Sequence, residues 1–293
     1  MDLLIDFAIS LVRNIVLGIM MGSVYALAAM GLALLFGVAN LINFAHGEYV
    51  MLAMYMAYFF SVTLVIDPVV SSIINIPLFF VIGLVTYLLF FKRVINAPPL
   101  SQIAVTVGVL VLLRNIALVI WQAEPKAPPF TIFSASYKIG PIIIPIDKLF
   151  ATIISVTSLI LLYLFLERSK FGTAMRAAAD DVDAVSMMGI DTGRLFLLTL
   201  GISMMLVGLS GSLIMMYQAV TPTSGLLFGL LSWAIVALAG LGSIRGIYIA
   251  AVIFGLADAL ASGLWDPRGR EIILYGLFIL ILWLKPRGLW GRR

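Results

Sequence analysis

Long apolar runs separated by short polar segments limit what this chain can fold into more than any other feature. The runs cover approximately residues 15–39, 50–66, 73–91, 102–121, 148–166, 195–219, 228–242, 247–264 and 272–284. About 20 apolar residues let an α-helix cross the roughly 30 Å hydrocarbon core of a bilayer. Inside lipid the backbone must satisfy its own hydrogen bonds, which restricts spanning segments to helices and closed barrels. The spacing therefore predicts repeated helical spans.

The composition agrees with this prediction. Hydrophobic residues make up 63% of the 293 residues and charged residues 11%, whereas a soluble domain carries about 25% charged residues. An outer-membrane barrel would show short alternating segments, and the sequence has none. We predict an all-α, polytopic transmembrane helical bundle of eight to ten spans, formed by a single transmembrane domain over residues 1–293. The runs 228–242 and 272–284 are short, so we expect discontinuous helices there.

Several classes of function are disfavoured by residue usage. There is no cysteine and only one histidine, so neither a disulfide framework nor a zinc cluster of cysteine and histidine is expected. We expect no cofactor in this chain. The net charge of +4 does not indicate nucleic acid, because basic residues in a membrane protein mostly mark cytoplasmic loops. The first residues carry acids before the first arginine, the reverse of a secretory signal, so no leader is expected.

The distribution of lysine and arginine predicts the orientation. With the loop after Leu166 in the cytoplasm, alternation of the spans places most basic loop residues inside, as the positive-inside rule requires. The inside set is Lys92, Arg93, Arg168, Lys170, Arg176, Arg194, Arg245, Lys285, Arg287, Arg292 and Arg293, and the outside set is Lys126, Lys138, Lys148, Arg268 and Arg270. The chain is thus predicted to be a multi-pass membrane protein with a cytoplasmic C-terminus.

Two loops are long enough to have structure of their own. The predicted external loop, residues 122–147, is rich in proline and could form a structured cap or a plain connector with a hairpin. The predicted cytoplasmic loop, residues 167–194, combines high charge with a helical pattern. Its alanine-rich part favours one or two short helices. The acidic cluster Asp180, Asp181 and Asp183 would cap the second of these helices, and Gly189 would end it.

From Val182, the apolar residues Val182, Val185, Met188 and Gly189 recur at helical spacing and would form one apolar face. A short amphipathic helix on the cytoplasmic face either lies on lipid or fits a groove on a soluble partner. Helices that lie on membranes favour basic polar faces. This one is acidic, which favours the protein partner.

The same loop resembles a known signature. Its order, Ala-Met-Arg-Ala-x-Ala-x-Asp followed by Ala-x-x-x-x-Gly-Ile, is similar to the coupling loop of binding-protein-dependent ABC importer permeases. The branched-chain amino acid (Leu/Ile/Val) permease family also has counterparts of GLALLFGVANLINFAHGEYVMLAMY (31–55), ALAGLGSIRGIYIAAVIFG (237–255) and LKPRGLWG (284–291). Four motifs in the expected order cover nearly the whole chain. The length resembles the shorter of the family's two subunit types.

The resemblance implies a transport mechanism and a set of partners. A second permease subunit, two cytoplasmic ATPase subunits and an extracytoplasmic solute-binding protein would act with this chain on an amino-acid substrate in the lipid bilayer. ATP and Mg²⁺ would be bound by the ATPases, and the chain indeed has no Gly-x-x-x-x-Gly-Lys-Ser/Thr motif. Val182 and Ser186 depart from the family pattern. Residues implied in coupling to the ATPase are Arg176, Ala179, Asp181, Ala184, Met188 and Gly189.

Two polar, glycine-containing breaks interrupt the apolar runs. The first, NFAHGEY (43–49), holds the only histidine and lies next to GVAN. Unpaired polar groups are costly in lipid, so we predict a helix break near the inner mouth of a pathway, with Asn40 and Asn43 capping and His46 and Glu48 near water. The second break is GLGSIRG (240–246). The candidate pathway or gate residues are Asn40, Asn43, His46, Glu48, Gly240, Gly242 and Ser243, with a purely structural role left open.

Other polar residues within or beside the spans have two interpretations each. Arg114 and Asp258 are ionisable residues inside spans, where such residues usually pair, and a salt bridge between them is possible. Thr221 and Thr223 follow a long span on the predicted external side. They would line an outer vestibule or simply form a turn.

The leading prediction is a permease subunit of an ABC importer for branched-chain amino acids, not an enzyme. A permease for urea or short amides is an alternative, because an apolar lumen with little fixed charge would suit it almost equally. An ion-coupled secondary transporter would need paired intramembrane carboxylates. Only one carboxylate, that of Asp258, clearly lies inside a predicted span. An intramembrane enzyme would need a nucleophile and base, and no such set is visible.

Overall fold

The computed structural model describes residues 2–133, 135–139, 142–240, 244–264, 270–285 and 288–289, and it is almost entirely helical. The elements run α1 (Asp2–Ala39), α2 (His46–Thr63), α3 (Pro68–Leu89), η1 (Phe91–Arg93), α4 (Pro99–Trp121), β1 (Ser136–Ile139), β2 (Ile142–Pro145), α5 (Ile146–Arg168), α6 (Lys170–Asp180), α7 (Val182–Met187), α8 (Thr192–Met215), α9 (Ser224–Ala239), α10 (Ile244–Leu264) and α11 (Arg270–Leu284). A helix occupies every predicted span, which confirms the polytopic helical bundle.

Fewer of these helices could cross a bilayer alone than the eight to ten that the sequence predicts. Within the described residues, six are long and apolar enough: α1, α3, α4, α5, α8 and α10. The helix α9 has only 16 residues, about 24 Å at the usual rise per residue. It falls short of the roughly 30 Å hydrocarbon core. The expectation of short helices at 228–242 and 272–284 is confirmed.

Helix starts follow from local capping chemistry. Asp67 precedes α3 and accepts a hydrogen bond from the Val69 amide at 2.8 Å, with Pro68 in the first turn. Proline suits this position because the first-turn amides have no helical partner. Pro99 likewise opens α4. Asp191 caps α8 through the Arg194 amide at 3.0 Å.

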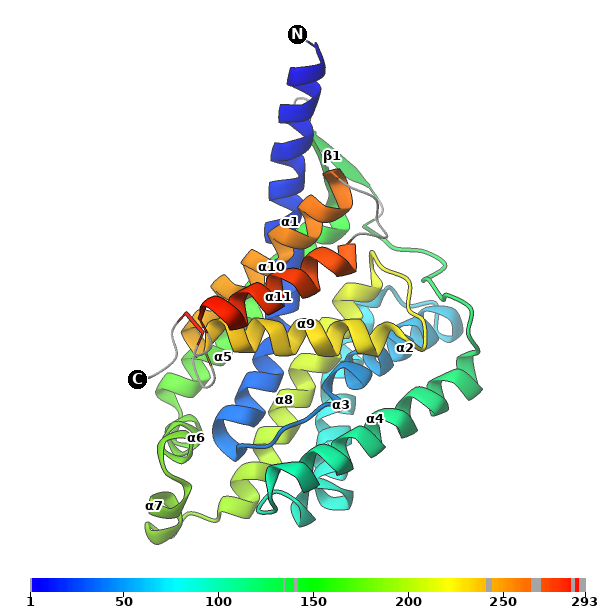
Figure 1. Cartoon of the computed structure of the whole chain (residues 1–293). Coiled ribbons are helices and arrows are strands. Elements are labelled where there is room, and N and C mark those ends of the chain that lie inside the picture. The colour runs from blue at the N-terminus through cyan, green and yellow to red at the C-terminus, as the bar shows by residue number, and fades with distance from the viewer. Residues whose placement is uncertain are drawn as a thin grey trace.

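The bundle has a buried centre and a loose periphery. Most of α1 and α8 is buried, whereas most residues of α3, α4 and α5 are only partly buried or exposed. The helix α1 packs closely on α10, and α3 packs on α8. The helix α4 lies at the edge of the bundle (Figure 1), and its exposed side chains include Leu100, Val111 and Val119. Such a mainly apolar exposed surface has to meet lipid or another subunit.

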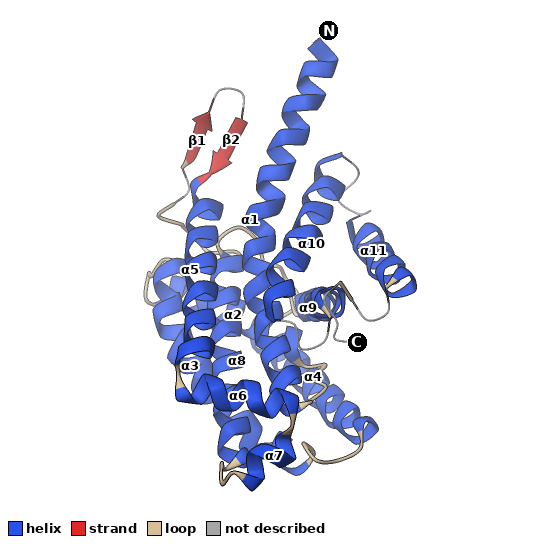
Figure 2. Cartoon of the chain, turned by 90° about the vertical axis from the view of Figure 1, so that its left-hand side faces the viewer, coloured by secondary structure: helices blue, strands red, loops and turns tan. Residues whose placement is uncertain are grey.

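The two ends of the bundle carry different structures. An antiparallel hairpin of β1 and β2 pairs Ser136 with Pro145 and Tyr137 with Ile144, and it lies at the end where the N-terminal part of α1 projects (Figure 2). The hairpin expected in the 122–147 loop is confirmed, and a role of this loop as a cap stays a prediction. The helices α6 and α7 lie at the opposite end. The two long loops therefore face opposite sides, as the alternation of spans predicts.

Candidate translocation and coupling sites

The first break, residues 40–45, is a sharp change of direction between α1 and α2. Asn40 ends α1 with φ of +48°, a left-handed conformation that asparagine tolerates better than most residues. The Asn43 side chain accepts a hydrogen bond from the Ala45 amide at 3.1 Å. The residue that precedes α2 is Ala45, with no side-chain cap. The predicted break is confirmed, but Asn43 shapes the turn instead of capping the helix.

His46 connects this break to the middle of α1. Its side chain is fully buried, and Nε2 lies 2.8 Å from the Ala28 carbonyl oxygen. A carbonyl can only accept, so Nε2 carries the proton in this contact. Nδ1 has no hydrogen-bond partner among the described residues. The imidazole therefore joins α2 to α1.

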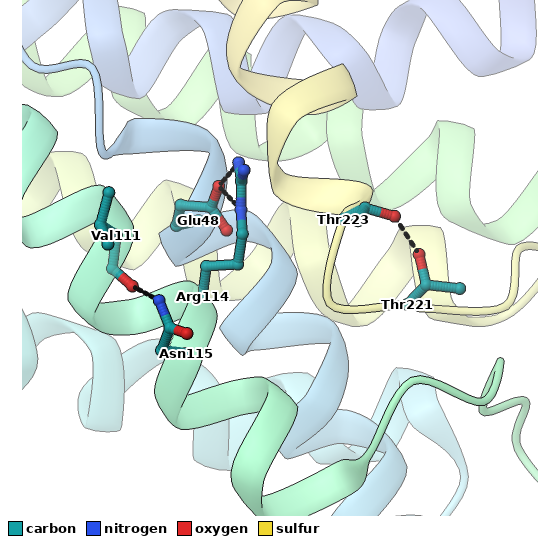
Figure 3. A network of polar contacts seen from close by, with 6 residues as sticks. All are labelled: Glu48, Val111, Arg114, Asn115, Thr221 and Thr223. Carbon is teal, nitrogen blue, oxygen red and sulfur yellow. Dashed lines mark hydrogen bonds and ion pairs between the residues drawn. The ribbon is translucent and has the colours of Figure 1, made fainter.

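Glu48 forms an ion pair that the sequence analysis did not predict. Arg114 on α4 donates from both Nε, at 3.2 Å, and Nη2, at 2.5 Å, to the single carboxylate oxygen Oε1 (Figure 3). The Glu48 side chain is 1% exposed and the Arg114 side chain 30%. The other carboxylate oxygen, Oε2, is buried with no hydrogen-bond partner. A buried carboxylate and a half-buried guanidinium thus face each other within the bundle.

The start of α9 lies directly against this pair. A Cβ atom built on Gly225 would overlap the Glu48 carboxylate, and one on Gly47 would overlap the backbone of Gly225 and Gly229. Only glycine permits this approach of two helices. Before α9, the Thr221 and Thr223 hydroxyls lie 3.1 Å apart in a turn (Figure 3). The turn interpretation of this segment is confirmed.

The structure corrects one prediction about the intramembrane charges and decides a pairing that the sequence left open. His46 and Glu48 do not lie near water but are buried by α1, α4 and α9. Arg114 pairs with Glu48 and not with Asp258. Asp258 is buried and accepts a hydrogen bond from the Tyr25 hydroxyl at 2.8 Å. Sequence spacing does not show which spans are neighbours, so the partners of Arg114 and Asp258 could not be read from it.

The second break is described only in part. Gly240 ends α9 with φ of +90°, which confirms a break at this glycine, whereas Gly242 and Ser243 lie outside the described residues. The Leu289 amide donates to the Leu238 carbonyl at 2.7 Å. Gly288 approaches the Gly240 backbone so closely that a Cβ there would overlap it. Two motifs that are far apart in the sequence, 237–255 and 284–291, therefore meet.

The predicted coupling loop contains two short helices, as expected. Ser169 begins α6 by accepting from the Gly172 amide at 2.8 Å. Asp181 begins α7 by accepting from the Ala184 amide at 3.0 Å, so it is the member of the acidic cluster that caps. Gly189 follows α7 with φ of +81°, in the conformation that glycine favours after a helix. The role of these helices in coupling stays a prediction.

The apolar residues of α7 do not share one face. Val185 is 1% exposed and packs inward, whereas Met187 is 87% and Met188 68% exposed. The expectation that Val182, Val185 and Met188 form a single docking face is wrong, because Val182 also packs against the core. Ala179, Asp181, Ala184 and Gly189 are exposed, and Arg176 forms a 2.6 Å ion pair with Glu167. The methionines are left as the apolar surface of this end.

A crevice joins the two groups of predicted residues. It has a volume of about 340 Å³ and lies between the end of α1 and the junction of α6 with α7. Asn40 and Gly37 line one side, and Ala179, Asp180 and Val182 line the other. Gln102 on α4 supports the same region, since its amide accepts from the Ile42 amide at 3.1 Å. The junction of α6 and α7 therefore lies beside the α1–α2 break.

No arrangement for a metal is present in the part of the chain that the structure describes, since no three imidazole or carboxylate side chains come together there.

The chain matches the sequence model of one protein family over residues 14–282. This family is described as "Branched-chain amino acid transport system / permease component". The chain belongs to this permease family. No solved structure matches the chain.

Curated relatives of this permease extend over nearly its whole length. It is 27% identical to the high-affinity branched-chain amino acid transport system permease protein BraD of Pseudomonas aeruginosa, covering 96% of this chain and 95% of the relative. It is 29% identical to LivH of Escherichia coli K12, a permease protein of the same description, over 94% of each chain. A probable permease of this type in Methanocaldococcus jannaschii is 26% identical. The resemblance carried by four sequence motifs is thus confirmed along the chain.

Proposed function

We propose that this permease is the membrane-spanning subunit of a binding-protein-dependent ABC importer that moves branched-chain amino acids into a prokaryotic cell. The observation that carries the proposal is the family match over residues 14–282. The relatives named above are described as branched-chain amino acid permeases, which favours these substrates over urea or amides. ATP would be hydrolysed by separate subunits.

The proposed assembly pairs this chain with a second permease subunit, two cytoplasmic ATPases and an extracytoplasmic binding protein. Exposed Met187 and Met188 offer an apolar contact for an ATPase groove. The crevice between α1 and the α6–α7 junction offers a route from that contact to the α1–α2 break. We infer that ATPase closure moves α6 and α7, and that this motion changes access to the interior of the bundle.

Uptake measurements test the transport activity. The chain is expressed with its partner subunits in cells that lack their own branched-chain amino acid uptake, and labelled leucine is supplied. Uptake should require this chain and should be reduced by unlabelled isoleucine or valine but not by urea. The purified chain alone should not hydrolyse ATP. Uptake of urea in place of leucine, or hydrolysis by the lone chain, would contradict the proposal.

The orientation and the coupling contact are tested with variants. A cysteine at Thr173 or at Gly291 should react only from the cytoplasm. Gly189→Trp should abolish co-purification of the ATPase because the bulk would block the groove, and Met188→Ala should weaken it. Asp183→Asn should have little effect, since Asp181 and not Asp183 caps α7. If Gly189→Trp leaves co-purification and uptake normal, α6 and α7 only connect α5 to α8 and do not couple to the ATPase.

A further inference from the structure

We propose that Glu48 and Arg114 bind the charged groups of the transported amino acid, the ammonium group at Glu48 and the carboxylate at Arg114. The inference rests on the proposed function, because it assigns a site on the path of the same substrate. It starts from an ion pair that the transport activity by itself does not explain.

The geometry of the pair leaves hydrogen-bonding capacity on both sides. A fully engaged arginine and carboxylate form two parallel bonds, one to each oxygen. Here Nε and Nη2 of Arg114 both donate to Oε1 of Glu48. Oε2 has no hydrogen-bond partner within the described residues, and no bond from Nη1 is formed there either. One acceptor and one donor group therefore remain next to each other.

The unused acceptor of Glu48 and the unused donor group of Arg114 match the two charged groups of a free amino acid. The ammonium group has only donors, which an unpartnered carboxylate oxygen accepts. The carboxylate group has only acceptors, which a guanidinium nitrogen satisfies. A buried polar atom without a partner is unfavourable, so binding a ligand that supplies both partners would remove an existing cost. Water can satisfy these atoms too, but it brings no charge.

The position of the pair also favours a site that faces a path. About a third of the Arg114 side chain is exposed, although α4 is a membrane-spanning helix. A charged side chain that faces hydrocarbon is costly, and such residues normally face a cavity or another protein. We therefore place the open side of Arg114 toward an aqueous path, with the proposed second permease subunit as its opposite wall.

The first turn of α9 covers the acceptor in this conformation. Gly225 lies against the Glu48 carboxylate, and Oε2 is buried there. Access for an ammonium group therefore requires the start of α9 to move away. The helix is short and begins in a turn held by hydroxyl contacts of Thr221 with Thr223 and Ser224. Such a segment can shift without breaking a long helix.

The test measures protection of a thiol beside the pair. The chain has no cysteine, so Thr223→Cys introduces its single thiol, and labelling is followed on this chain by mass. The assembled importer, without its binding protein, is placed in lipid nanodiscs with and without a non-hydrolysable ATP analogue. Leucine should slow labelling in at least one of the two states. Labelling of a Met187→Cys control should not respond to leucine.

Two leucine analogues separate the halves of the site. 4-Methylpentanoate lacks the ammonium group, and isopentylamine lacks the carboxylate. Glu48→Gln keeps an acceptor for Arg114 but removes the anion, and it should raise the leucine concentration for half-protection by roughly tenfold or more, because charge-assisted bonds are strong. It should leave protection by 4-methylpentanoate unchanged. Arg114→Gln should weaken protection by 4-methylpentanoate and leave protection by isopentylamine unchanged. Asn115 is next to Arg114, and within the described residues its side chain bonds only to Val111 of its own helix. Asn115→Ala should therefore give the same protection as the parent.

Each outcome decides one question. Equal loss of protection by all three ligands in both variants would show that the pair only holds α2 and α4 together. Absence of protection in both states, in an importer that still moves leucine, would overturn the site but leave the proposed function intact. Failure of the unmodified importer to move leucine would overturn the proposed function instead.

Discussion

Two ion pairs of the same chemistry, Glu48–Arg114 and Glu167–Arg176, lie in opposite environments. Their closest nitrogen–oxygen distances are alike, 2.5 Å and 2.6 Å. The Glu48 side chain is 1% exposed, whereas the Glu167 and Arg176 side chains are 36% and 38% exposed. Equal distance therefore does not mean equal energy, because solvent screens the second pair on both sides, whereas in the first pair only the Arg114 side chain, at 30%, is exposed.

The free energy that each ion pair contributes depends on how far it is buried. An exposed pair contributes about 0.2–1 kcal/mol, while removing one member of a buried pair costs about 3–5 kcal/mol, because a charge is left without a partner. The interior can thus hold charges in a defined place. The α6–α7 end gains little from its exposed ion pair, and it leaves Met187 and Met188 exposed.

The largest effect is expected for Glu48→Ala. It strands the Arg114 guanidinium and should lower the free energy of unfolding by about 3 kcal/mol, the lower end for a buried pair, because 30% of the Arg114 side chain is exposed. The loss is measured as reduced thermal stability of the purified complex. Glu48→Ala combined with Arg114→Met should recover most of this loss, since no unpaired charge remains. If the double variant is as unstable as the single one, packing of Glu48 and not its charge is what matters.

A smaller effect is expected for Gly225→Ala, because the added methyl group meets the Glu48 carboxylate. Overpacking of this kind costs about 1–3 kcal/mol. The cost should nearly disappear in the Glu48→Ala background, which removes the colliding group. Gly108→Ala is the matched control, since nothing lies near its Cβ position on α4 and alanine favours a helix by up to about 1 kcal/mol. Equal destabilisation by both variants would contradict the contact.

The cap of α7 should matter less. Asp181→Ala removes the acceptor for the Ala184 amide, and loss of such a cap costs about 1 kcal/mol. Hydrogen exchange of the amides from 182 to 188 should speed up by several-fold, while Asp183→Ala should leave it unchanged. If only Asp183→Ala speeds up exchange, Asp183 and not Asp181 caps α7.

The smallest effect is expected for Arg176→Gln, which breaks the exposed pair. Stability should fall by no more than about 1 kcal/mol, and the loss should shrink further at high salt, because salt screens exposed charges. Thermal unfolding at low and high ionic strength measures both values. A loss as large as that of Glu48→Ala would remove the contrast between the two environments.

Local features were predictable from the sequence. The apolar runs predicted every spanning helix, because a helix in lipid depends on composition over about 20 consecutive residues. The start of α7 in the acidic cluster and its end at Gly189 followed from capping preferences. A hairpin in the loop at 122–147 was one of the two interpretations that its sequence allowed. Each of these signals depends on neighbours in the chain.

Only the tertiary structure decided which distant residues meet. Sequence reasoning placed His46 and Glu48 near water and offered Asp258 as a partner for Arg114, whereas packing of α2 against α1, α4 and α9 buries both residues and gives Arg114 to Glu48. The sequence by itself determined where helices form, since that free energy is local. It did not determine partners, because in an apolar bundle many lateral arrangements bury similar surface, and a few close contacts such as that of Gly225 with Glu48 select one.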